Sequence, residues 1–99
     1  VELPETAPDS THIYHVFALL VDRRDELQAH LAQQGVPTLI YYPLPLHLQK
    51  VYADYGWKPG DFPVAEQVSR RILPLPMYPE LTDEQVDRVI RVIRTFFGR

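Results

Sequence analysis

Apolar side chains follow two different spacings along the chain, and together they predict an α+β fold. Residues 11–21 are rich in β-branched and aromatic side chains, which indicates a strand whose two faces both become apolar toward its C-terminal end. Residues 38–42 form a second short apolar run and predict a second strand. Residues 73–77 are rich in proline, which lacks a backbone N–H, so we expect at most a short edge strand there.

A helix is expected near residues 23–34, between the first two strands. Leu27 and Leu31 lie four residues apart, which places them on one helix face. Asp22 is a candidate N-cap, and Gly35 suits the position just beyond the C-terminus. A strand–helix–strand sequence with short loops fits a split βαβ unit or a parallel crossover.

Two more helices are expected in the second half of the chain. Pro63 suits the first turn of a helix near residues 63–72. Thr82 and Gln85 have the spacing of a capping box, which predicts the start of a helix near residues 83–97. The apolar residues of this last helix recur at helical spacing and are expected to be buried: Val86, Val89, Ile90, Ile93 and Phe97. The three helices would pack with a small sheet of two or three strands.

Length and composition limit the choice of function. The 99 residues suit one small domain, and the net charge of −3 with no strongly basic stretch argues against a grip on nucleic acid. Cysteine is absent, so disulfides and thiolate metal sites are excluded. The longest apolar run, residues 16–21, is too short to span a membrane, and no secretory signal is visible. A cytoplasmic location without a membrane partner is the default expectation.

The first ten residues differ in character from the rest. Residues 1–10 contain two prolines together with several acidic and hydroxyl side chains, a composition typical of an extended linker. We therefore expect a linker over residues 1–10 and a folded domain over residues 11–99. A linker at the front also leads us to expect that the chain is part of a longer protein.

Metal binding and nucleophilic catalysis find little support in the sequence. His12 and His15 lie three residues apart on an expected strand, so they point to opposite faces and do not chelate one ion together. His30 is expected on the surface of a helix. The chain contains two lysines, Lys50 and Lys58, and neither has the neighbours that activate a Schiff-base lysine. No metal site and no catalytic residue is predicted within this chain.

Residues 41–49 are the strongest candidate for a binding surface. They bring Tyr41, Tyr42 and His47 close together along the chain, and two prolines stiffen the backbone that leads to the histidine. A short helix is expected to follow around residues 48–55. Local pattern alone favours a plainer interpretation, with one core tyrosine, one surface tyrosine and a histidine in a loop.

Five short segments carry motifs in a recognisable order. They cover residues 12–17, 24–27 with 35–38, 42–49, 60–66 and 75–82. The third reads Tyr-Pro-Leu-Pro-Leu-His-Leu-Gln and the fourth Gly-Asp-Phe-Pro-Val-Ala-Glu. Together they resemble the C-terminal small domain of the DegT/DnrJ/EryC1/StrS family of sugar aminotransferases. One such motif is weak, whereas five in order are specific, and they extend over nearly all of the chain beyond its first ten residues.

The resemblance implies a fold-type I enzyme that uses pyridoxal phosphate to move an amino group, usually from glutamate, onto a keto sugar linked to a nucleotide. The sequence His-Leu-Gln after the prolines resembles that of the branch of the family that acts on 3-keto sugars. In that family the cofactor lysine and most phosphate contacts lie in a large N-terminal domain, which has no counterpart in these residues. Pyridoxal phosphate is therefore expected only in the full-length enzyme. This chain alone is expected to bind none of it and to be inactive in isolation.

The resemblance also implies substrate-binding roles for three residues. His47 matches the family histidine that lies at the active site near cofactor and sugar, and Tyr42 matches the aromatic residue of a His-Tyr-Pro segment. Tyr41 stands where many relatives have histidine. The expected partners are the missing large domain, a dimer mate and the nucleotide sugar. Without the first two, an apolar patch is left uncovered and self-association is expected.

Two other hypotheses stay open from the sequence. One is a stand-alone binding or interaction module that uses the same Tyr-Pro-His surface without catalytic activity. The other is an α+β fold that binds no ligand at all. A clean monomer at high concentration, without affinity for partner chains, would count against an exposed interface. Unchanged chemical shifts of Tyr42 and His47 on addition of nucleotide sugars would favour the second hypothesis.

Overall fold

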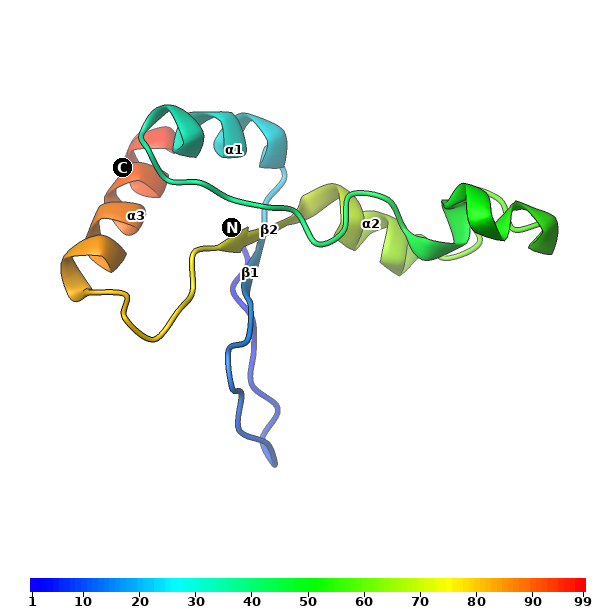
Figure 1. The fold of residues 1–99 in the computed structure, drawn as a ribbon, viewed down its shortest axis with the longest axis horizontal. Coiled ribbons are helices and arrows are strands. Elements are labelled where there is room, and N and C mark those ends of the chain that lie inside the picture. Colours follow the sequence, from blue (N-terminus) through cyan, green and yellow to red (C-terminus); the bar gives the residue numbers. More distant parts are fainter.

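Two short antiparallel strands lie at the centre of the molecule (Figure 1). The structure is a computed structural model that describes residues 1–99. Strand β1 pairs with β2 from Phe17 opposite Leu75 to Leu20 opposite Ile72. The element order is β1 (Phe17–Leu20), α1 (Arg24–Gln33), the 3-10 turns η1 (Leu46–Leu48) and η2 (Lys50–Tyr55), α2 (Pro63–Arg71), β2 (Ile72–Leu75) and α3 (Asp83–Phe96). The expected α+β fold is confirmed.

The apolar core lies between the sheet and the two helices α1 and α3. Leu27 and Leu31 are fully buried on one face of α1, as their four-residue spacing predicts. They pack with β1 and β2 in a small cluster comprising Leu19, Val21, Leu27, Leu31, Val36 and Leu73. On α3, Val89 and Ile93 pack against this cluster from the side. Only one end of the molecule therefore has a conventional core.

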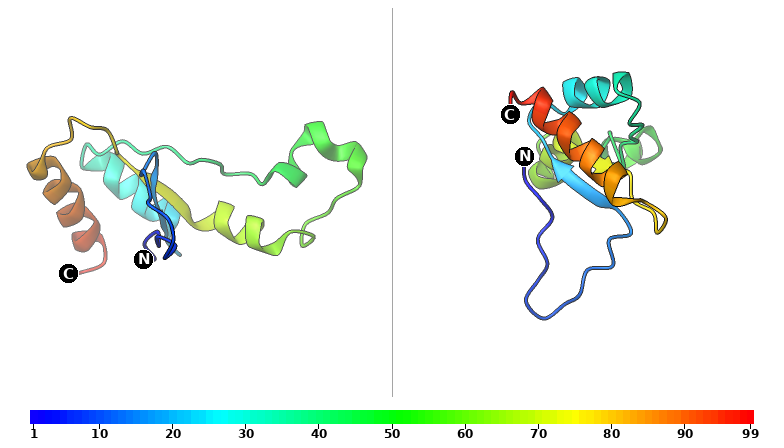
Figure 2. Two further views of the ribbon diagram at one scale, coloured as in Figure 1. Left: turned by 90° about the horizontal axis from the view of Figure 1, so that it is seen from below. Right: turned by 90° about the vertical axis from the view of Figure 1, so that its left-hand side faces the viewer.

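Two parts of the chain extend away from that core. The segment from η1 through α2 forms one arm, and the loop before β1 forms the other (Figures 1 and 2). The radius of gyration is 15.7 Å, whereas a compact domain of this length has about 12.6 Å. The accessible surface is 7645 Å², about 1,800 Å² more than the roughly 5,800 Å² of a compact monomer of this mass. We refer to residues 46–71, from η1 to the end of α2, as the arm.

Hydrogen bonds to backbone carbonyl groups attach the arm to the core. Arg24, at the start of α1, is largely buried, and its Nη1 donates to the carbonyl oxygens of Ser69 and Ile72 at 3.3 Å each. The backbone N–H of Val21 donates to the carbonyl of Arg71 at 2.9 Å. The end of α2 is therefore joined to both β1 and α1, where the arm meets the core.

The strand expected near residues 38–42 is wrong, and so is the parallel crossover built on it. These residues run from α1 toward η1 without strand pairing. One edge of β1 is occupied by β2, and at the other edge Leu20 forms a bridge with Glu2. The open edge of β2 contains Pro74, which has no N–H to pair with a third strand. The proline-rich segment pairs over Ile72–Leu75, close to the edge strand expected near 73–77.

The first strand is shorter than the expected span of residues 11–21. Tyr14 has a positive φ of 48°, which interrupts extended backbone, and its N–H donates to Nδ1 of His12 at 2.8 Å. Residues before Phe17 therefore turn away from β2 instead of extending the ladder. Glu2, by contrast, is held at the sheet, where its carboxylate pairs with Arg71 at 2.6 Å. The assignment of residues 1–10 to a linker stays a prediction.

Helix termini show which local signals decide the structure. The capping box is confirmed, because Thr82 accepts from the N–H of Gln85 while the Gln85 side chain accepts from the N–H of Thr82. The N-cap expected at Asp22 is wrong, because α1 starts after Arg23 with no side-chain cap. The Asp22 carboxylate instead lies 2.7 Å from Nε of Arg71. Asp22 therefore pairs with Arg71, at the end of α2, instead of capping α1.

The apolar stripe of α3 is only half covered. Val89 and Ile93 contact the core, and so do Val92 and Phe96, but Val86, Ile90 and Phe97 stay exposed, against expectation. No helix in the structure has the length and apolar character needed to cross a membrane.

Candidate functional site

A buried ionisable pair joins the two halves of the arm. Nε2 of His47 in η1 lies 3.0 Å from Oε1 of Glu66 in α2. Only 7% of His47 and 8% of Glu66 is exposed. The same carboxylate oxygen accepts the backbone N–H of Gly60 at 2.7 Å. The arm thus has no apolar core, and its interior is organised around one carboxylate.

Local sequence explains how the two side chains meet. Pro45 holds extended backbone immediately before η1, which turns His47 inward. Pro63 starts α2, and Glu66 lies in its first turn, where its N–H donates to the carbonyl of Phe62 at 3.0 Å. The Phe62 ring also packs on the imidazole, with ring centroids 4.8 Å apart. The residues of the two motifs at 42–49 and 60–66 therefore form one structural unit.

The hydrogen bonds define the protonation of this pair. The Gly60 N–H lowers the pKa of Glu66, and the His47 side chain lowers it further, while burial opposes both effects. An ionised carboxylate only accepts hydrogen bonds, so Nε2 of His47 carries the proton in this contact. Nδ1 of His47 makes no hydrogen bond within the chain and is not fully enclosed. It is the imidazole nitrogen that is left without a partner in the chain.

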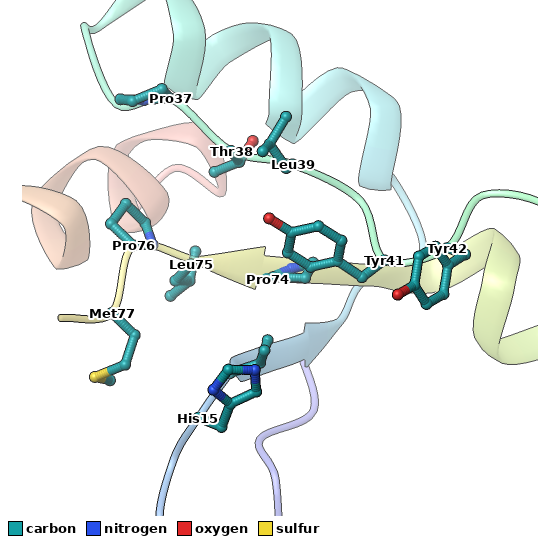
Figure 3. Close-up of a pocket in the computed structure, with 11 residues that line it drawn as sticks. His15, Pro37, Thr38, Leu39, Tyr41, Tyr42, Pro74, Leu75, Pro76 and Met77 are labelled. Atoms are coloured by element: carbon teal, nitrogen blue, oxygen red, sulfur yellow. The ribbon is translucent and has the colours of Figure 1, made fainter.

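Two cavities lie on either side of Tyr42. A cavity of about 420 Å³ is lined by Tyr42 and His47 together with Trp57 and Phe62. A second, of about 740 Å³, is lined by Tyr41 and Tyr42, by His15 and by the end of β2 (Figure 3). In that view Tyr41 lies beside Pro74 of β2 and Tyr42 lies farther along toward α2. Tyr42 forms part of both walls.

The three residues expected at the site have different surroundings. Tyr42 and Tyr41 are 71% and 45% exposed, and their rings meet edge to face at 5.9 Å, so neither is the core tyrosine of the plainer interpretation. His47 is buried instead of lying open in a loop. His47 and Tyr42 share one cavity, and Tyr41 and Tyr42 share the other.

Glu66 was not identified from the sequence, although it belongs to the 60–66 motif. A signal was available, because an acid in the first turn of a helix after Phe-Pro is well placed for a hydrogen bond with a turn just before it. The partner of Glu66 is 19 residues away in sequence, and no local pattern indicates which histidine it meets. The exposed rings of Tyr55 and Trp57, which stack at 5.0 Å, extend the aromatic surface next to Phe62.

The two cavities beside Tyr42 present groups suited to binding. No group of three potential metal ligands occurs in the structure. Lys50 and Lys58 are both exposed, and neither lines one of the two cavities beside Tyr42. These residues do not fit an imine with pyridoxal phosphate. What the surface offers is an imidazole nitrogen and two phenol groups on a largely apolar wall.

The small α+β domain thus carries a candidate binding wall formed by His47, Tyr42 and Tyr41. The model of the DegT/DnrJ/EryC1/StrS aminotransferase family matches residues 1–94. The chain belongs to this family.

Relatives of known name agree with the family assignment. The chain is 47% identical over 94 residues to the erythromycin biosynthesis sensory transduction protein EryC1 of Saccharopolyspora erythraea, covering 95% of the chain and 26% of that protein. It is 41% identical over 99 residues to the dTDP-3-amino-3,4,6-trideoxy-alpha-D-glucose transaminase of Streptomyces venezuelae, covering 100% and 26%. Its fold matches the crystal structure of S. venezuelae DesV in complex with a ketimine intermediate, with a TM-score of 0.94, 42% identity and coverage of 99% and 26%. The chain spans about a quarter of the length of these relatives.

Proposed function

We propose that the chain is the small-domain part of a transaminase that uses pyridoxal phosphate and acts on a nucleotide-linked keto sugar. The observation that carries this proposal is the match to S. venezuelae DesV over 99% of the chain at 42% identity. Pyridoxal phosphate, when bound, supplies the electron sink for amino-group transfer. Because Lys50 and Lys58 do not fit the cofactor imine, we assign the cofactor lysine to a part of the protein outside residues 1–99.

We further propose that the amino group is transferred to carbon 3 of the sugar. The S. venezuelae relative is named for a 3-amino sugar product. A relative from Acidithiobacillus ferrooxidans, 39% identical over 94 residues, is named a UDP-N-acetyl-3-dehydro-alpha-D-glucosamine 3-aminotransferase. These two names share the sugar position and differ in the nucleotide, so the proposal specifies the carbon and leaves the nucleotide open.

His47, Tyr42 and Tyr41 are proposed as the substrate-side residues of this chain. His47 and Tyr42 line one cavity, Nδ1 of His47 has no partner in the chain, and Tyr41 lines the neighbouring cavity. Phenol groups and an imidazole offer hydrogen bonds to sugar hydroxyls, and the largely apolar wall offers contacts to the rest of the ring. Their contribution is to bind and orient the sugar, which lowers the entropic part of the barrier without any bond being made by this chain.

The exposed apolar surface supports the proposal that the chain works as part of an assembly. Its accessible surface exceeds that of a compact monomer by about 1,800 Å², and a typical stable interface buries about 800 Å² on each partner. We assign this surface to contacts with a large cofactor-binding domain and with a dimer mate. Alone, the chain is proposed to be inactive and to self-associate through the same surface.

The test is a graft. Residues 1–99 replace the matching quarter of the S. venezuelae transaminase, and amino transfer to that enzyme's nucleotide sugar is measured with the product analysed by NMR. The expected result is activity in the graft with the new amine on carbon 3, and none in the truncated enzyme or in the 99-residue chain alone. A graft that folds as a dimer and binds pyridoxal phosphate but transfers no amino group would overturn the proposal. So would imine absorbance from the 99-residue chain by itself.

A further inference from the structure

Glu66 carries the one buried carboxylate of the arm. Its Oε1 accepts from Nε2 of His47 at 3.0 Å and from the Gly60 N–H at 2.7 Å. No arginine or lysine pairs with it, although the chain has other carboxylates that do form such pairs. A buried ionised carboxylate needs hydrogen-bond donors, and a histidine nitrogen that faces it must carry the proton.

We infer that Glu66 is a positioning residue: it holds His47 in its Nε2–H form and leaves Nδ1 as the nitrogen presented to the cavity that Tyr42 also lines. The inference rests on the proposed function, in which His47 faces the substrate. Glu66 does not line that cavity, so the inference assigns a role to a residue outside the proposed substrate-side wall.

The packing around the pair explains why Glu66 can hold the imidazole in one orientation. The ring of Phe62 packs on the imidazole at 4.8 Å, and Glu66 fixes its Nε2 edge, so that rotation of the ring breaks a hydrogen bond and a packing contact together. Gly60 in turn fixes the carboxylate from the other side. A histidine held in this way has already lost its rotamer freedom before a ligand binds, which reduces the entropic cost of binding.

The tautomer also specifies which ligand group fits. In the neutral imidazole, Nδ1 is an acceptor when Nε2 carries the proton. It therefore suits a hydroxyl donor, and a sugar offers several. The aromatic residues that share the cavity, Tyr42, Trp57 and Phe62, are suited to the apolar face of a sugar ring. We assign this cavity to one hydroxyl-bearing ring of the substrate.

The first test measures the histidine directly and needs no activity. The chain contains four histidines, so ¹⁵N-histidine labelling gives few signals, and His47→Asn identifies the signal of residue 47. At neutral pH a directly bonded Nε2–H correlation is expected for His47, because the proton is buried and hydrogen-bonded. Glu66→Ala is expected to remove it by exposing the proton to exchange, and Glu66→Gln to retain it, since an amide oxygen also accepts.

The second test is kinetic and uses the graft. Glu66→Ala is expected to lower kcat/KM by about 10–100-fold, on the scale seen when a carboxylate that orients a functional histidine is lost. Glu66→Gln is expected to recover most of that loss. Val36→Ala is the matched control, because it removes buried apolar atoms from the core without touching His47. Normalised to folded enzyme, this control is expected to keep its kcat/KM.

The outcomes separate the inference from the proposed function. An inactive wild-type graft contradicts the proposed function, and the NMR experiment still decides the state of His47. An active graft in which Glu66→Ala keeps full kcat/KM overturns the inference. A protonated Nδ1 in the wild-type chain, or an Nε2–H signal unchanged in Glu66→Ala, overturns it as well. An equal loss in Val36→Ala and Glu66→Ala would reduce Glu66 to a structural role.

Discussion

The core around α1 and α3 and the arm from η1 to α2 are stabilised by different kinds of interaction. The core buries six apolar side chains from four parts of the chain and contains few hydrogen-bonded side chains. The arm buries two side chains, His47 and Glu66, which are both ionisable, while most of its aromatic rings stay exposed. Apolar burial is non-directional and tolerates adjustment, whereas a buried hydrogen-bonded pair fixes orientation. The candidate site therefore lies in the arm, where a hydrogen-bonded pair fixes side-chain orientation. Most of the apolar burial that stabilises the fold lies in the core.

The largest expected effect comes from a change in the core. Leu31→Ala removes a fully buried side chain and is expected to lower the free energy of unfolding by about 2–5 kcal/mol. With a cluster of only six buried apolar residues, such a loss is a large share of total stability. Urea unfolding followed by circular dichroism measures it. A change below about 1 kcal/mol would show that the core is less important than the comparison states.

The second prediction concerns acid and belongs to the arm. The pKa of Glu66 is lowered in the folded state, chiefly by the Gly60 N–H, so its stabilising contribution is complete above the unfolded-state pKa of about 4.3. That contribution is lost as the pH falls through the lower folded-state pKa. Glu66→Gln is therefore expected to unfold with a weaker dependence on pH below about 4.3. Parallel unfolding curves of wild type and variant over that range would contradict the prediction.

The third prediction tests a local signal at the edge of the core. Thr82→Ala removes the side-chain acceptor at the start of α3 and is expected to cost about 1 kcal/mol of stability. Asp22→Ala is expected to cost less stability than Thr82→Ala, because Asp22 does not cap α1 and pairs instead with Arg71 near the surface. Thermal unfolding of both variants compares the two termini. A larger loss for Asp22→Ala would indicate that the bond to Arg71 outweighs a helix cap.

The smallest effect is expected for the same chemical change made in the arm. Leu46 is 67% exposed in η1, so Leu46→Ala is expected to change the stability of the isolated chain by less than about 0.5 kcal/mol. In the graft the cost is expected to be larger if the partner domain covers this surface. Unfolding of Leu46→Ala and Leu31→Ala in both contexts separates a surface that is covered in the assembly from one that stays open.

The sequence predicted features that depend on neighbouring residues and failed where distant segments decide. The capping box at Thr82, the three helices and the short helical segment after His47 follow from local spacing and turn chemistry. The strand at residues 38–42 does not form, because strand pairing depends on distant segments: β1 pairs with β2 and is bridged to Glu2, and the open edge of β2 contains Pro74. The same limit explains the site. His47 and Tyr42 were recognisable from their motif, but the partner of His47 follows from how α2 returns along η1.

The composition of β2 has a consequence for how the isolated chain can aggregate. The outer edge of the two-stranded sheet belongs to β2, which contains Pro74 and is followed by Pro76. Proline has no N–H to offer to an incoming strand, so this edge is a poor template for strand addition. The exposed apolar surface can bring copies of the chain together by side-chain packing, but the β2 edge resists extension by another strand. Aggregates formed at high concentration are therefore expected to dissociate on dilution and to give no fluorescence with amyloid dyes.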